Sequence, residues 1–182
     1  TLIFDVNFVG IFNQYTAIPD PNFEQALIDY GYDDVIDGQV LTANISDIEY
    51  LVVDNENISD LTGIEDFTAL TYLGCGGNEL TNLDVSNNIY LEELKCANNS
   101  LIQLDLSSNI LLKDLVCEHN QISELNLVNN TLLEEINCNS NQLISLMIPG
   151  ILSLTHLSCD SNNLSTINLN GCLNLNELHL GF

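Results

Sequence analysis

Cysteine recurs in this chain at one fixed interval, and this interval limits the possible folds more than any other feature. Five cysteines are each 21 residues from the next: Cys75, Cys96, Cys117, Cys138 and Cys159. The same leucines and one asparagine surround each of them, as in LEELKCANNSLIQLDLSSNIL at residues 91–111. Self-similarity at so short a period is typical of a solenoid, in which each repeat packs only on its neighbours.

The repeats occupy most of the chain. A 22-residue unit covers residues 48–69, and an incomplete unit begins at Leu175. Between them lie five 21-residue units, which begin at Leu70, Leu91, Leu112, Leu133 and Leu154. This period predicts a leucine-rich repeat solenoid over residues 48–182. Apolar side chains alternate along the LxxLxC half of each unit, which predicts short strands stacked into a parallel sheet. The LxxLxL half predicts a second extended segment rather than a helix.

The repeated cysteine takes a position that is apolar in the other units, where Val53 and Leu180 occupy it. Cysteines on adjacent strands would point in the same direction rather than toward one another, which disfavours disulfide bonds. We therefore predict buried free thiols that behave as small hydrophobic side chains. The sequence has no CxxC and no Cys–His pair at the spacing of zinc ligands, so no metal site is predicted from the cysteines.

Asparagine recurs three residues after each cysteine, where the chain turns away from the strand. The five members are Asn78, Asn99, Asn120, Asn141 and Asn162. A buried amide at this point can both donate to and accept from the backbone of adjacent turns. We therefore predict a structural asparagine ladder rather than a ligand site.

Residues 15–47 predict a small N-terminal cap that covers the first repeat. Asp20 suits the N-cap of a helix over residues 18–31, Pro21 its first position, and Gly31 the residue after its end. The acidic stretch 33–47 is a poor match to a calcium-binding loop and predicts a structural turn. Residues 1–14 are apolar and too short to span a membrane, and they fit either the remnant of a signal peptide or an N-terminal arm.

Charge narrows the classes of partner. The chain has 26 acidic residues, two lysines and no arginine, for a net charge of −24. Nucleic acids and anionic membranes both require basic surfaces, so neither is expected as a partner. The balance favours a cationic partner, a weakly bound divalent cation, or simply solubility in a salty medium. No other cofactor is predicted.

Strand positions that point away from the core form the candidate binding face. Both lysines and all three histidines of the chain fall on it or at its edge. The candidate binding residues are Tyr72, Glu93, Lys95, Asp114, Glu118, His119, Glu135, Asn137, His156, Glu177 and His179. Stacked strands would place Glu93, Asp114 and Glu135 about 5 Å apart, where like charges repel. Lysines, a cationic partner or a bound cation could relieve that repulsion. The alternative is a solvated acidic face without a ligand.

Catalysis is not predicted. The sequence has no nucleophile motif such as GxSxG that a histidine could activate. An open sheet face also excludes little water from a reaction. His156 and His179, with Glu135 and Glu177 nearby, could hold a metal ion, but this is the less favoured interpretation.

These units resemble the 21-residue, cysteine-bearing leucine-rich repeats of bacteria. The segments IPDPNFEQALIDYG at 18–31 and NISDLTGI at 57–64 resemble the start of secreted or cell-surface members of that group, and the plan is similar to that of internalins. The resemblance covers about residues 15–182 and implies non-catalytic extracellular recognition or adhesion, with a protein or glycan as partner. The alternative is a structural spacer that displays another domain.

Overall fold

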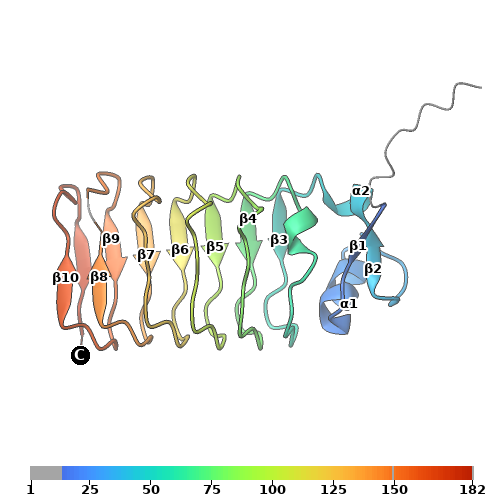
Figure 1. Ribbon diagram of the computed structural model, residues 1–182, viewed down its shortest axis with the longest axis horizontal. Coiled ribbons are helices and arrows are strands. Elements are labelled where there is room, and N and C mark those ends of the chain that lie inside the picture. Colours follow the sequence, from blue (N-terminus) through green and yellow to red (C-terminus); the bar gives the residue numbers. More distant parts are fainter. Residues whose placement is uncertain (1–13, 149, 182) are drawn as a thin grey trace, which may run out of the picture.

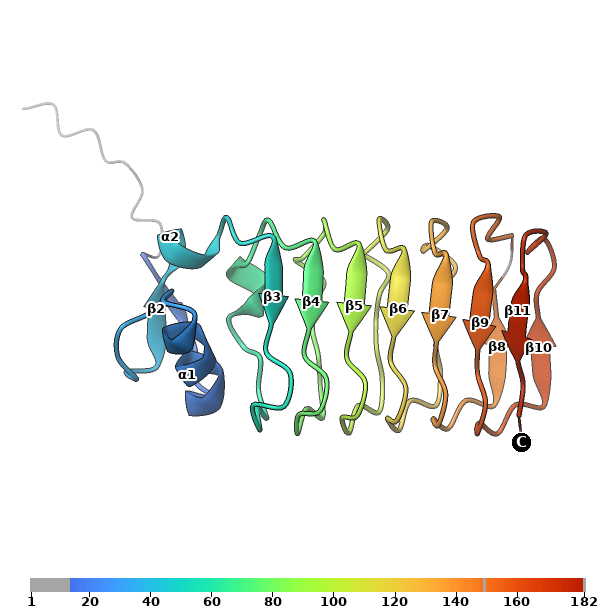
Figure 2. The ribbon, with the colours of Figure 1, turned by 180° about the vertical axis from the view of Figure 1, so that it is seen from behind.

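A computed structural model describes residues 14–148 and 150–181 of the chain. The repeats stack into an elongated solenoid with a small cap against its first turn (Figure 1). Seven parallel strands of three residues each form the main sheet (Figure 2). In chain order they are β3 (Tyr50–Val52), β4 (Tyr72–Gly74), β5 (Glu93–Lys95), β6 (Asp114–Val116), β7 (Glu135–Asn137), β9 (His156–Ser158) and β11 (Glu177–His179). The predicted leucine-rich repeat solenoid and its parallel sheet are therefore confirmed.

The return side of the solenoid is less regular than the sheet. Within residues 14–148 and 150–181 two strands form there, β8 (Ser145–Met147) and β10 (Thr166–Asn168), and they pair in parallel. In the 91–111 unit, Leu101, Leu104 and Leu106 turn inward and are buried without forming a strand. The predicted second extended segment thus forms strands in the last two complete units, and Asn126 in the unit before them makes an isolated parallel bridge to Met147.

The cap consists of four short elements. Strand β1 (Tyr15–Ala17) pairs antiparallel with β2 (Gln39–Leu41), and the helices α1 (Pro21–Asp29) and α2 (Thr42–Ile45) flank them. A single 3-10 turn, η1 (Ile64–Asp66), follows in the first repeat. No helix in the described part of the chain is long and apolar enough to cross a membrane. The prediction for residues 1–14 lies outside the described residues, apart from Gln14.

Asp20 joins the cap to the first repeat. Its Oδ1 accepts hydrogen bonds from the backbone N–H groups of Asn22 and Phe23, at 2.9 and 3.2 Å, which confirms it as the N-cap of α1. Its Oδ2 accepts from the backbone N–H and hydroxyl of Ser59, both at 2.8 Å, and from the N–H of Asp60 at 3.1 Å. Burial would raise the pKa of Asp20, but these hydrogen bonds outweigh it and hold the pKa below its ordinary value.

The acidic turn after α1 is built around a carboxylate. Buried Glu24 accepts hydrogen bonds through Oε1 from the N–H groups of Asp37, Gly38 and Gln39, at 3.0, 2.7 and 3.0 Å. The backbone of the turn therefore points its donors at an anion that the protein supplies itself. These hydrogen bonds give part of the acidic stretch a structural role.

The five repeated cysteines form a buried column behind the sheet, and all are free thiols. Burial raises the pKa of Cys96 and Cys117 well above the ordinary value, so these thiols stay protonated. At the cap end, the rings of Phe23 and Phe67 stack with centroids 6.1 Å apart and close the core.

The asparagines that follow the cysteines form the expected ladder. Asn120 is representative: its Nδ2 donates to the carbonyls of Cys96 and Cys117 at 3.0 and 3.1 Å, and its Oδ1 accepts from the N–H of Leu101 at 3.0 Å. Each rung therefore bonds to its own unit and to the previous one. The ladder satisfies backbone groups that the turn would otherwise leave unpaired.

A second asparagine ladder, which the sequence analysis did not identify, runs along the return side. Asn88, Asn109 and Asn130 are fully buried, and each donates two hydrogen bonds to backbone carbonyls. Their Oδ1 atoms have no hydrogen-bond partner. Ile151 and Cys172 replace this asparagine in the two units that carry β8 and β10.

Candidate functional site

The register of the main sheet aligns outward-pointing side chains into rows. Each strand pairs with the next without a shift, so the third residues of successive repeats lie side by side. The central row reads, from the cap outward, Tyr50, Tyr72, Glu93, Asp114, Glu135, His156 and Glu177. We call the exposed surface that carries this row the sheet face.

Both lysines of the chain form ion pairs within the sheet face. Lys95 donates to Asp114 on the neighbouring strand, and Lys113 donates to Glu92 at 2.6 Å. The hydrogen bond to Glu92 raises the pKa of Lys113. The lysines therefore relieve part of the repulsion in the acidic row, while Glu93 and Glu135 form no ion pair with either lysine.

His156 stands between two carboxylates. Its Nδ1 lies 3.8 Å from Glu135 Oε1, and its Nε2 lies 3.7 Å from Glu177 Oε1. Its Nδ1 also lies 2.8 Å from the hydroxyl of Thr155. His156 and the two glutamates border a shallow depression of about 290 Å³, to which Asp114 and His179 contribute as well. The depression is open to solvent. It can receive a side chain of a partner, but it excludes little water from a reaction.

The other candidate residues lie at the edge of the sheet face. Glu118 accepts a hydrogen bond from Asn137 Nδ2 at 2.8 Å, which orients both side chains. His119 is exposed and has a left-handed backbone with φ of 53°. The same position in the other units holds glycine, asparagine or serine, so His119 also serves the turn.

Aromatic rings begin the central row. Tyr50 and Tyr72 stack with centroids 4.2 Å apart and an interplanar angle of 19°. Burial, followed by a hydrogen bond with Tyr50, raises the pKa of Tyr72 to about 12. Tyr72 is among the candidate residues predicted from the sequence and Tyr50 is not, although Tyr50 occupies the third position of the first, 22-residue unit.

The side chains of the described residues do not match the arrangement that a metal ion requires. Within residues 14–148 and 150–181, no three His, Cys, Asp or Glu side chains are placed so that they could hold a metal ion. The carboxylates of the central row stand side by side rather than converging on one point.

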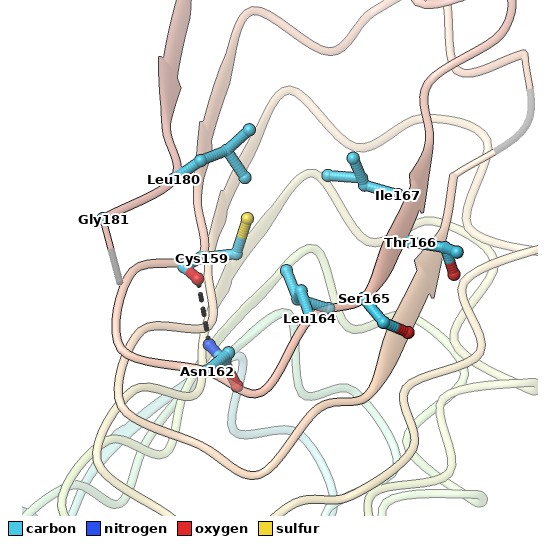
Figure 3. A pocket seen from close by; sticks show the side chains of 8 residues that line it. All are labelled: Cys159, Asn162, Leu164, Ser165, Thr166, Ile167, Leu180 and Gly181. Atoms are coloured by element: carbon cyan, nitrogen blue, oxygen red, sulfur yellow. Dashed lines mark hydrogen bonds between the residues drawn. The ribbon is translucent and has the colours of Figure 1, made fainter.

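The last turn of the solenoid carries an apolar cavity of about 170 Å³ (Figure 3). Leu164, Ile167 and Leu180 line it together with Cys159, the final rung of the cysteine column. Its lining continues the core of the solenoid and lies apart from the sheet face.

Comparison with known proteins gives structural relatives only. No family model matches the chain, and no curated protein matches it by sequence. Among solved structures, the functional domain of InlJ from Listeria monocytogenes, which includes a cysteine ladder, is 26% identical with a TM-score of 0.75. The match covers 92% of this chain and 43% of that one.

Two further matches have the same architecture. A leucine-rich repeat protein of Leptospira interrogans is 23% identical over 76% of this chain and 38% of its own, with a TM-score of 0.64. The internalin InlF of Listeria monocytogenes is 17% identical over 91% of this chain and 76% of its own, with a TM-score of 0.60.

The chain spans less than half the length of the first two of these structures. Leucine-rich repeat proteins of the internalin type are typically protein-interaction modules. The 21-residue repeats, the buried cysteine column and these structural matches show a leucine-rich repeat fold similar to that of bacterial internalins.

Proposed function

We propose that this chain is a non-catalytic extracellular recognition module that binds a protein partner through the sheet face. The observation that carries the proposal is the in-register row, which holds aromatic, acidic and histidine side chains at fixed spacing on one exposed surface. The extracellular location is proposed by analogy with the internalins among the structural matches.

The sheet face is suited to binding because its side chains are already positioned. Backbone ladders hold the strands about 4.8 Å apart. Ion pairs and side-chain hydrogen bonds then orient Lys95, Asp114, Glu118 and Asn137. A partner that docks on this surface therefore pays little ordering entropy on the repeat side.

The charge of the sheet face favours a cationic partner. Glu93 and Glu135 flank Asp114 in the central row and form no ion pair with the two lysines. A partner with spaced lysine or arginine side chains would neutralise them and associate rapidly at low salt. A glycan partner would use the aromatic rings and amides instead, and a divalent cation could assist either one.

A charge-matched pair of variants tests the proposal. The first, Glu93→Gln/Asp114→Asn/Glu135→Gln, neutralises the sheet face. The control, Asp84→Asn/Asp105→Asn/Glu124→Gln, removes the same charge from the return side, where these residues border a separate depression. Peptides selected from a displayed library on the unmodified chain supply the ligands.

We expect the selected peptides to bind the sheet-face variant at least tenfold more weakly and the control variant within about twofold of the unmodified chain. Equal losses in both variants would mean that only net charge matters. A library that yields no binder, or binders that ignore both variants, would favour the alternative of a structural spacer. A thermal midpoint raised by calcium beyond matched ionic strength would show cation-assisted binding.

A further inference from the structure

The cap-proximal end of the sheet face differs chemically from its centre. The central row changes there from carboxylates to the stacked rings of Tyr50 and Tyr72. Tyr50 is 60% exposed although it is a large aromatic residue. Exposed aromatic side chains of this kind are enriched among the residues that dominate binding energy at interfaces.

A glycine lets the Tyr72 ring approach a carboxylate. The other complete units place Val52, Lys95, Val116, Asn137 or Ser158 where β4 has Gly74. A Cβ atom at Gly74 would lie 3.3 Å from Tyr72 Cε1 and 3.4 Å from both carboxylate oxygens of Asp54. The absence of a side chain at Gly74 therefore leaves room for the ring and the carboxylate beside the same stretch of backbone.

Asp54 is held in place, and its charge is not neutralised by a lysine. Its Oδ1 accepts a hydrogen bond from the N–H of Gly76 at 2.5 Å. Asp54 and Glu93 both act electrostatically on Tyr72. The two lysines of the chain bond to Asp114 and Glu92 instead. The tyrosine pair thus lies in a negative field.

We propose that Tyr50, Tyr72 and Asp54 form a site for an arginine side chain of the protein partner. This inference rests on the proposed function and names the group that the sheet face would recognise. A guanidinium stacks on aromatic faces and donates to carboxylates in the same plane, whereas an ammonium is a compact and strongly hydrated charge. Aromatic rings beside carboxylates therefore favour arginine over lysine.

Fluorescently labelled octa-arginine and octalysine, titrated into the intact chain at two salt concentrations, test the site. The double variant Tyr50→Leu/Tyr72→Leu removes the rings, and Tyr50→Phe/Tyr72→Phe keeps them. Gly74→Val adds a side chain that the equivalent position of β6 already carries, as Val116. Asp54→Asn keeps the acceptor for Gly76 and removes the charge, with Glu124→Gln on the return side as its control.

We expect the unmodified chain to bind octa-arginine about tenfold more tightly than octalysine. The leucine variant and Gly74→Val should weaken octa-arginine binding about tenfold and reduce this preference, whereas the phenylalanine variant should retain both. Asp54→Asn should weaken binding more than Glu124→Gln does. Thermal melts of each variant separate loss of the site from loss of the fold.

Equal affinity for the two peptides, unchanged by the leucine variant, would overturn the arginine site. The triple sheet-face variant in the same titrations shows which proposal has failed. If that variant still weakens binding, the sheet face binds cations but the tyrosines do not select arginine. If it has no more effect than its return-side control, the proposed use of the sheet face fails as well.

Discussion

The first repeat and the last described turn of the solenoid carry equivalent apolar side chains in different surroundings. At the cap end, Ile18, Phe23 and Phe67 are fully buried and seal the first repeat. At the last turn, the side chains that continue the core are only half-buried or exposed, and they border the open cavity of Figure 3. A repeat of this kind cannot bury its own apolar face, so its stability depends on what covers it.

Among the substitutions considered, Asp20→Ala in the cap is expected to lower the free energy of unfolding most. The substitution removes the acceptor of five hydrogen bonds, of which two cap α1 and three join it to the first repeat. Loss of a helix cap and of partners for buried donors should cost about 3 kcal/mol. Urea unfolding measures the change.

Asp60→Ala is the control for that measurement, because Asp60 is exposed and its side chain accepts only from the N–H and hydroxyl of Thr62. It should cost less than about 1 kcal/mol. Equal effects of the two substitutions would show that Asp20 does not hold the cap.

The asparagine ladder compares the middle of the solenoid with its open end. Asn120 and Asn162 make equivalent bonds, but Asn120 is buried and Asn162 is only half-buried. We expect Asn120→Ala to cost about 2–3 kcal/mol and Asn162→Ala about 1 kcal/mol, because water can replace the lost partners at the open end. Urea unfolding measures both changes in free energy. Equal losses for Asn120→Ala and Asn162→Ala would show that solvent access does not set the cost.

Acid should weaken the cap through Asp20. Its pKa is lower in the folded chain than its ordinary value of 3.8, so its contribution is fully present above that value and is lost as the pH falls through the folded pKa. The difference in thermal midpoint between the unmodified chain and Asp20→Asn should therefore shrink from about pH 6 to about pH 2. A constant difference over this range would exclude the charge of Asp20 as the cause.

The rate at which thiols react should also differ between the last turn and the buried cysteine column. The substitution used in this test is expected to change stability least. Cys172 is half-buried near the open end, whereas the cysteine column is buried. In the native chain Cys172 should react first with a disulfide reagent, and Cys75, Cys96 and Cys117 should react only as the chain unfolds. Cys172→Ser should remove the fast phase. A fast phase that survives this substitution would place an accessible thiol in the column.

Several structural features followed from the sequence because each depends on one repeat or its neighbour. The cysteine period predicted the stacking of strands, and the spacing of Asn120 and its equivalents predicted their ladder. Asp20 and Pro21 marked the start of α1 because helix capping is a local effect. The ion pair between Lys113 and Glu92 was also accessible to sequence reasoning, since the register places these residues on adjacent strands.

Other features depend on contacts between segments that no period connects. Glu24 reads as an ordinary helical residue until the turn at 37–39 directs three N–H groups at it. Asp54 gains its position from Gly76 in the next unit and its proximity to Tyr72 from the missing side chain at Gly74. The second ladder gives only a weak signal in the sequence, because its asparagines persist in three units and are then replaced by Ile151 and Cys172.

The repeat sequence by itself determined the solenoid, the parallel sheet, the buried thiols and the row of side chains on the sheet face, because stacking repeats its geometry at every turn. Only the tertiary structure decided how the cap is held to the first repeat, which carboxylates the two lysines neutralise, and where aromatic rings lie beside an acid. Those outcomes depend on side chains that meet across turns of the chain, and hydrogen bonding and packing select among the arrangements that the repeat allows.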